Sequence, residues 1–172
     1  AEVPGLRPEQ YSGDKSSDIE WLMWIMNEID GINKYDIFSI LRPTSPLRNT
    51  YSIKKAYKFF IQKKTYDSLR AVNKCKQHPA KMWSLKKNQL FPIMKNLENK
   101  KVPFHSQQYA NLPEIYIQNA SLEIAWTKIL KRKNPTISGK KILGFVSSGF
   151  EGFDINDKED IYLLKYLIKK NI

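Results

Sequence analysis

The sequence predicts an α/β fold with a mostly parallel sheet, and three observations support this prediction. Amphipathic helices predicted over 19–29 and 52–64 flank a predicted strand at 35–41, as in a sheet covered by helices. Residues 35–41 form an apolar run without polar alternation, which is typical of a strand buried on both faces. Pro43 and Pro46 then end this run in a stiff loop with two arginines and two hydroxyls. Open α/β sheets bind ligands at such loops, although an ordinary solvated connection would contain the same residue types.

The composition indicates a globular protein and limits the kinds of partner that it could bind. With 41% hydrophobic and 12% aromatic residues, the chain can bury a core, and we expect one globular domain over 1–172. The net charge is +12, but only five of the 29 basic residues are Arg, and the lysines are spread along the sequence. This distribution favours an anionic small substrate over nucleic acid, although a basic nucleic-acid-binding protein remains an alternative.

The same composition bears on compartment and metal chemistry. The single cysteine, Cys75, excludes an intrachain disulfide and a metal site built from several cysteines. No apolar run approaches the roughly 18 residues of a membrane span, so we expect no membrane partner. A reducing cytoplasm fits these features.

The first half of the chain predicts two helices around the strand at 35–41. Apolar residues recur with the helical period from Ile19 to Ile29. Asp14, Ser16 or Ser17 could cap this helix, and Glu20 would complete a capping box with Ser17. A second helix is predicted over 52–64, with Asn49 or Thr50 as its N-cap. Its predicted buried face consists of Ile53, Ala56, Tyr57, Phe60 and Ile61, and its lysines face solvent.

The rest of the chain predicts three more strands, a hairpin and a helix. We expect strands at 67–73, after 119 and at 140–146, a hairpin turn at 86–89 and a long loop over 95–111. A final amphipathic helix begins after Asp157, which can cap it. The helical period predicts that four of its apolar residues face inward, namely Ile161, Leu164, Leu167 and Ile168.

Five stretches carry a resemblance to a known family. The loop Leu41-Arg42-Pro43-Thr44-Ser45-Pro46-Leu47-Arg48 resembles the signature of the acylneuraminate cytidylyltransferases. Four other stretches resemble the family in order and approximate spacing: Arg7-Pro8 with Asp14 and Ser17, His78-Pro79-x-Lys81-x-Trp83, Tyr116-x-Gln118-Asn119, and Asp154-Ile155-Asn156.

The resemblance implies a fold and a reaction. The fold would be a three-layer nucleotide-diphospho-sugar transferase domain, which is Rossmann-like, and an excursion at about 81–112 would help to form a homodimer. The reaction would transfer CMP from CTP to a nonulosonic keto sugar acid of the sialic acid type, with Mg²⁺ as cofactor and pyrophosphate as product. Which keto sugar acid would be used is left open.

The resemblance also implies roles for single residues. Arg7 and Ser17 would bound the cytidine pocket. Asp154 would hold Mg²⁺, with Asn156 secondary. Alternation along an extended segment independently places Asp154 and Asn156 on the same side, where two oxygens could share a hard cation. The alternative is that this segment binds no metal and that Asp157 merely caps the last helix.

On the sugar side, Arg42 would lie beside the substrate and Lys81 would approach its carboxylate. Gln107, Gln118 and Asn119 would contact the sugar, although the last two could equally tie a loop to the sheet. Several positions depart from the family pattern, among them Tyr11 in place of Leu, Arg42 in place of the Gln of some relatives, Ala120 in place of Gly and a non-aromatic residue at 123. The family has Asp or Asn at the position of Asn156, and Asn there removes one negative charge from the metal site.

The beginning of the chain suggests that the family fold is N-terminally incomplete. The sequence starts without Met, and its seven glycines are scattered, whereas the family holds the CTP phosphates with a glycine- and lysine-rich loop. We therefore expect either a fragment or a truncated relative. The alternative function is a catalytically incomplete remnant or a dimerising partner of such an enzyme. If the enzyme reading holds, the segments around Arg7, Arg42, Lys81, Asn119 and Asp154 should converge at one rim of the sheet.

Overall fold

The computed structural model describes residues 3–95 and 102–170. The chain divides into two compact units, which we call unit 1 (residues 1–72 and 118–172) and unit 2 (residues 73–117). The predicted excursion at 81–112 falls within unit 2, and its residues 96–101 lie outside the described residues. Among the described helices, none combines the length and the hydropathy that a membrane crossing requires.

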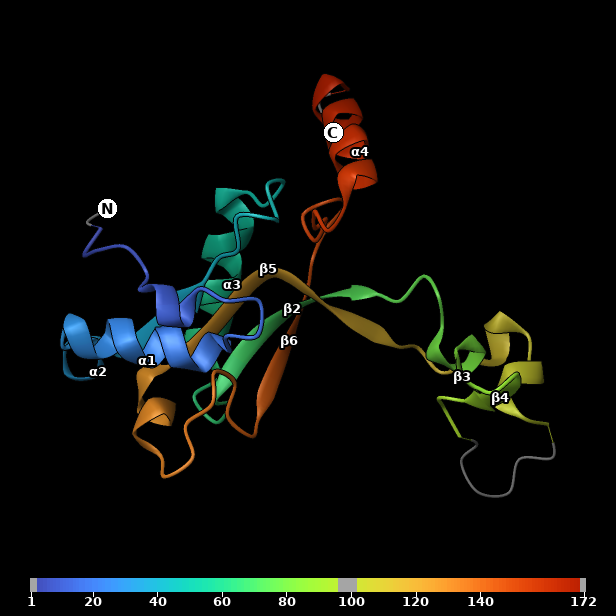
Figure 1. Ribbon diagram of the computed structural model, residues 1–172, viewed down its shortest axis with the longest axis horizontal. Coiled ribbons are helices and arrows are strands. Elements are labelled where there is room, and N and C mark those ends of the chain that lie inside the picture. The colour runs from blue at the N-terminus through green and yellow to red at the C-terminus, as the bar shows by residue number, and fades with distance from the viewer. Residues whose placement is uncertain (1–2, 96–101, 171–172) are drawn as a thin grey trace. The chain divides into compact units, whose positions relative to one another are not determined.

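A four-stranded sheet forms the centre of unit 1 (Figure 1). Its strands lie in the order β1 (Ile37–Ile40), β5 (Tyr116–Trp126), β2 (Ser68–Lys74) and β6 (Ile142–Val146). β1 and β5 are antiparallel, with Ile37 opposite Trp126, and β2 and β6 are parallel, with Ser68 opposite Ile142. The Trp126 N–H donates to the Asp67 carbonyl at 3.2 Å, so β5 ends where β2 begins and the two run in opposite directions.

The predicted α/β class is confirmed. The described strands form a mixed sheet, however, and not the mostly parallel sheet that was predicted. β1, β2 and β6 point the same way, whereas β5 runs against them from its place between β1 and β2. The reason is the connection between β2 and β5. Its described residues contain only 3₁₀ turns and a hairpin, and no helix long enough to carry the chain back across the sheet, so β5 returns antiparallel.

Helices cover the two faces of the sheet. α1 (Asp18–Glu28), which α2 (Gly31–Lys34) follows, places Leu22 and Met26 in one buried cluster with Phe38 of β1. α3 (Thr50–Gln62) places Ala56 and Phe60 in a second cluster with strand residues of β2 and β5. Neighbouring residues of β5 enter different clusters, Ala125 the first and Ile124 the second, because side chains alternate across a strand.

Three predictions of burial are wrong. Ser39 of β1 is exposed, although Ile37 on the same face packs against the second cluster, so this face is covered only in part. Tyr57 of α3 is exposed, and Phe59 contacts the cluster instead. In α4 (Lys158–Lys169), Leu167 is buried, but Ile161 and Ile168 are exposed, because a periodic apolar face does not determine what covers it.

Short elements complete the two units. Unit 2 contains the hairpin of β3 (Trp83–Lys86) and β4 (Gln89–Pro92), whose turn lies where the sequence predicts it. Lys87 and Asn88 have φ values of 47° and 70°, as a tight hairpin turn with two left-handed residues requires. The 3₁₀ helices are η1 (Glu9–Tyr11), η2 (Pro79–Lys81), η3 (Phe104–Ser106), η4 (Tyr109–Asn111) and η5 (Thr127–Lys131).

Candidate functional site

The loop after β1, residues 42–48, lies at the centre of the candidate site. The Ser45 N–H donates to the Arg42 carbonyl at 3.2 Å, which closes a turn, and Ser45 is completely buried. Asn49 caps α3, because its side-chain oxygen accepts a hydrogen bond from the Ser52 N–H at 2.8 Å. The loop is therefore held at both ends, by the strand before it and by a capped helix after it.

The segment that contains Asp154 lies against this loop. The Ile155 N–H donates to the Thr44 carbonyl at 2.9 Å, and the Ser45 hydroxyl donates to Asp154 Oδ1 at 3.3 Å. Glu151 accepts a hydrogen bond from the Asn49 amide and bonds from the Ser52 hydroxyl at 2.6 and 2.7 Å. Two of the stretches that carry the resemblance thus meet, although they lie more than a hundred residues apart in the sequence.

Arg42 at the start of the loop is paired with a carboxylate of α1. Its guanidinium donates to both oxygens of Asp18, with Nη1 at 3.2 Å from Oδ1. The hydrogen bond from Arg42 lowers the pKa of Asp18 against the opposing effect of burial, and the Trp21 indole N–H adds to the lowering from 3.1 Å. Asp18 in turn raises the pKa of Arg42. Both groups are charged at neutral pH and hold each other in a fixed orientation.

A second carboxylate, Glu123 of β5, lies behind this pair. Its side chain is only 5% exposed, with Oε1 at 3.6 Å from Arg42 Nη2 and Oε2 at 3.0 Å from Arg70 Nη2 of β2. No role was predicted from the sequence for Asp18, Glu123 or Arg70. The available signal was a charged residue within an apolar strand, as in Leu122-Glu123-Ile124.

The two residues predicted for the cytidine side both contact α1. The Arg7 guanidinium lies over the Trp21 ring, 4.7 Å from its centroid, in a cation–π contact. The N–H and hydroxyl of Ser17 donate to the Glu20 carboxylate at 2.7 and 2.8 Å, and these bonds lower the pKa of Glu20. The predicted pairing of Ser17 with Glu20 is therefore formed, and it uses the Ser17 hydroxyl.

Asn119 of β5 forms hydrogen bonds within unit 1, next to the sheet. It is buried, its amide nitrogen donates to the Ser147 hydroxyl at 3.0 Å, and its oxygen accepts bonds from the Ser121 N–H and hydroxyl. Arg48 of the loop donates to the Ser121 carbonyl at 2.5 Å, which connects Asn119 to the loop through one residue. Gln118 is exposed.

Lys81 and Gln107 belong to unit 2 and contact each other there. The Lys81 ammonium donates to the carbonyls of His105 and Gln107 at 2.7 and 2.6 Å, and the Gln107 side chain donates to the Val102 carbonyl at 2.9 Å. These bonds hold the segment around η3. The predicted contact of Lys81 with a substrate carboxylate stays a prediction.

The predicted metal ligands provide only part of a coordination shell. Asp154 is half-buried and Asn156 is exposed, and the Asn156 N–H donates to Asp160 at 2.8 Å. Asp157 also caps α4 by accepting from the Asp160 N–H at 3.0 Å, so both expectations for this segment are compatible. Within residues 3–95 and 102–170, no three His, Cys, Asp or Glu side chains come together as a metal site. This donor set suits an ion such as Mg²⁺, which takes one or two protein ligands and completes its shell with water and substrate phosphates.

No protein-family model and no curated protein matches this chain.

Proposed function

We propose that this chain belongs to a cytidylyltransferase that transfers CMP from CTP to a nonulosonic keto sugar acid and releases pyrophosphate. The observation that carries the proposal is the contact between the 42–48 loop and the Asp154 segment, at 2.9 Å between Ile155 and Thr44. It brings a carboxylate to a proline-stiffened loop at the carboxyl end of a strand, where α/β sheets bind ligands. The nucleotide-diphospho-sugar transferase fold is part of the same proposal.

The proposed chemistry relies on positioning and charge neutralisation. The anomeric hydroxyl oxygen bonds to the α-phosphorus of CTP, the bond from that phosphorus to the bridging oxygen breaks, pyrophosphate leaves, and the hydroxyl proton passes to water. Such a step needs no covalent enzyme intermediate. Bound Mg²⁺ would neutralise phosphate charge, and Asp154 with Asn156 would hold it.

Arg42 is the proposed anchor for the acid substrate. Asp18 and Glu123 fix its guanidinium from two directions, while a third of its side chain stays exposed. A guanidinium held in this way can present its remaining N–H groups to a carboxylate without losing rotamer freedom on binding. Arg7 and Ser17 are the proposed cytidine contacts, and Lys81, Gln107, Gln118 and Asn119 are the further proposed sugar contacts. We place the reaction in the cytoplasm.

We further propose a homodimer that forms through unit 2. Leu85 and Leu90 lie directly opposite each other on the β3–β4 hairpin and are 67% and 54% exposed. An isolated hairpin with apolar cross-strand pairs in solvent is marginal in water and gains stability from a partner surface. Changing both residues to Ser should convert a dimer into a monomer in light scattering, whereas Ser at the exposed Lys86 and Lys87 should not.

The alternative is a catalytically incomplete relative or partner. The scattered glycines favour it, because none of the described connections from strand to helix has a glycine-rich sequence that could hold phosphates.

A pyrophosphate-release assay separates the two functions. CTP and Mg²⁺ are combined with a panel of sialic, legionaminic, pseudaminic and octulosonic acids, using this chain and, in parallel, the product of the complete reading frame that encodes it. The proposal predicts turnover of at least one acid. It also predicts a loss of about a hundredfold or more in Asp154→Asn, with Glu159→Gln as the exposed control. If UTP with a hexose phosphate is used instead, the substrate class is wrong. If CTP binds without turnover in both proteins, the incomplete relative is the better explanation.

A further inference from the structure

The outer edge of β6 has no neighbouring strand in the described sheet. The hydrogen bonds on its inner side identify the backbone groups that point outward. β6 pairs with β2 on one side and ends the order of strands in the described sheet. The Ser147 N–H donates to the Val72 carbonyl at 2.9 Å, and the Lys141 carbonyl accepts from the Asp67 N–H at 2.7 Å. In a strand, every second residue directs both backbone groups to the same side. Ile142, Gly144 and Val146 therefore direct their N–H and C=O groups away from β2.

The side chains of this strand leave one face uncovered. Leu143 and Phe145 contact the cluster under α3, whereas Ile142 and Val146, on the opposite face, are 45% and 56% exposed. Between them, Gly144 adds no side chain that would obstruct a neighbour. Soluble proteins usually protect such edges with an inward-pointing charge, a proline or a bulge, and residues 142–146 contain none of the three.

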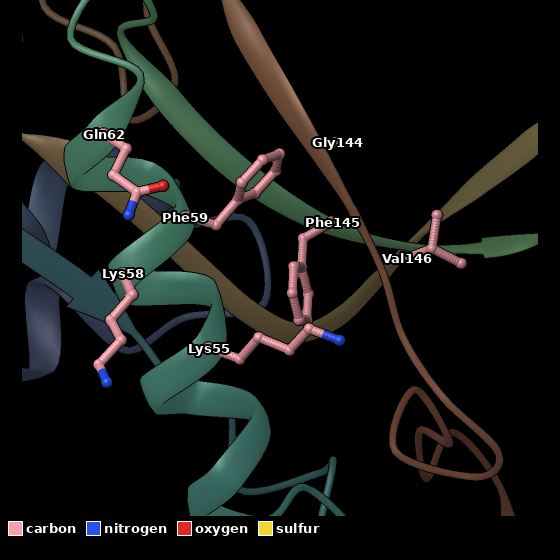
Figure 2. A pocket seen from close by; sticks show the side chains of 7 residues that line it. All are labelled: Lys55, Lys58, Phe59, Gln62, Gly144, Phe145 and Val146. Carbon is pink, nitrogen blue, oxygen red and sulfur yellow. The ribbon is translucent and has the colours of Figure 1, made fainter.

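A groove of about 420 Å³ runs between this edge and α3 (Figure 2). Phe59 of α3 and Phe145 of β6 form its apolar floor, and Lys55 and Lys58 of α3 also line it. The Lys55 side chain reaches toward Phe145, whereas that of Lys58 extends from α3 away from β6 (Figure 2). Neither lysine forms an ion pair with a described residue, and α3 contains no acidic residue. The groove therefore combines an apolar floor with uncompensated positive charge beside a row of backbone donors and acceptors.

We propose that an acidic, extended peptide segment of a partner protein binds here as an added strand beside β6. Such a strand would place alternate side chains on opposite faces. Acidic residues at one parity would face α3, where Lys55 reaches toward β6 and Lys58 adds to the positive charge, and apolar residues at the other parity would cover Ile142 and Val146. A second copy of this chain fits less well, because pairing two β6 edges would bring two lysine-rich α3 helices together.

The probe is a fluorescent synthetic peptide in which Glu alternates with Val, and its binding is measured by fluorescence anisotropy. Two control peptides are used, one of the same composition with all Glu residues at one end, the other with Lys in place of Glu. We expect the alternating peptide to bind at least about tenfold more tightly than either control, a difference of roughly 1.4 kcal/mol. Equal binding of the alternating and block peptides would overturn the proposal.

Two paired charge reversals locate the site. Lys55→Glu with Lys58→Glu should weaken binding about tenfold or more. Lys63→Glu with Lys64→Glu changes the net charge equally, beyond the end of the same helix, and should have a much smaller effect. Circular dichroism establishes that both variants are folded. An equal loss in both pairs would overturn the proposal, because it would mean that only net charge matters.

Amide hydrogen exchange tests the strand geometry directly. Binding should slow exchange at Ile142, Gly144 and Val146, whereas Leu143 and Phe145 are already protected by β2 before binding. Peptide binding without new protection at the three outward amides would contradict strand addition. Concentration-dependent protection of these amides in the chain alone would assign the edge to a second copy and overturn the proposal.

Discussion

Asp67, just before β2, holds three segments of the chain together. Its carboxylate accepts bonds from the Arg132 guanidinium, at 2.6 and 3.2 Å, and from the backbone N–H groups of Lys140 and Lys141, at 2.7 and 3.1 Å. Gly139 approaches so closely that an added Cβ would lie 2.5 Å from the Asp67 Cβ, and its φ of +67° also favours glycine. The Arg132 hydrogen bond is the main reason that the pKa of Asp67 lies well below its ordinary value.

This lowered pKa predicts a pH-dependent contribution to stability. The unfolded chain binds a proton at Asp67 near pH 3.9, whereas the folded chain does so only at lower pH. The stabilisation is therefore complete above about pH 5 and is lost as the pH falls through the lower folded-state value. We expect the difference in unfolding free energy between wild type and Asp67→Asn to be constant from about pH 5 to 7 and to shrink below about pH 4. Urea denaturation at a series of pH values measures it, and a difference that persists unchanged to about pH 3 would contradict the assignment.

Glu123 depends on its arginines because its carboxylate is buried. Arg70→Leu removes the partner at 3.0 Å and leaves only Arg42 at 3.6 Å. Removing one partner of a buried ion pair typically costs about 3–5 kcal/mol, and the remaining arginine should keep the loss near 3 kcal/mol. Urea denaturation provides the free energies.

The double variant Arg70→Leu with Glu123→Leu serves as the control for this prediction. It removes both charges, so it should be more stable than Arg70→Leu alone, and the double-mutant cycle then gives the coupling energy. Additive losses in the two single variants would show that the two side chains are not coupled in the folded protein.

At the scale of elements, α4 depends on its N-terminal cap. Only Leu167 is buried in this helix, so packing contributes little and local hydrogen bonds matter more. Asp157→Ala removes the bond to the Asp160 N–H and should cost about 1 kcal/mol of helix stability. Faster amide exchange in the first turn of α4 would report this loss. Glu159→Ala, an exposed change in the same turn, should have a smaller effect, and equal effects would argue against the cap.

Elements set by local rules could be predicted from the sequence. α3 begins after the predicted Asn49 cap, and the β3–β4 turn lies at the predicted residues, because capping and turn geometry depend on few neighbouring residues. The place of β5 between β1 and β2 could not be predicted from periodicity, since strand order depends on pairing between distant segments. The exposed side of α4 was mispredicted for the same reason.

In the candidate site, too, some contacts could be predicted from the sequence and others could not. The meeting of the 42–48 loop with Asp154 was expected from the family resemblance. The pairing of Glu123 with Arg70 was not, because it joins two strands whose adjacency the sequence does not reveal. A charge within an apolar strand indicates that a buried partner exists, but it does not identify the partner.

At the scale of the whole molecule, the two buried apolar clusters lie entirely within unit 1. We therefore expect unit 1 to fold when residues 74–116 are replaced by a short Asn-Gly turn that joins β2 to β5 as a hairpin. Its thermal unfolding should remain cooperative, and near-UV circular dichroism should retain the signals of Trp21 and Trp126. The separate peptide 73–117 serves as the counterpart and should show little cooperative unfolding. Loss of cooperative unfolding in the shortened chain would mean that unit 2 is needed to complete the core.

The position of β5 also constrains the order in which the protein can fold. β1 and β2 emerge from the ribosome before β5, yet they are not neighbours in the finished sheet, because Ile37 pairs with Trp126 far downstream. Until synthesis passes that tryptophan, both strands have unpaired edges toward a vacant central position. A nascent chain in this state is prone to pair the wrong strands or to aggregate, so we expect slow, late sheet closure and a benefit from chaperones during translation.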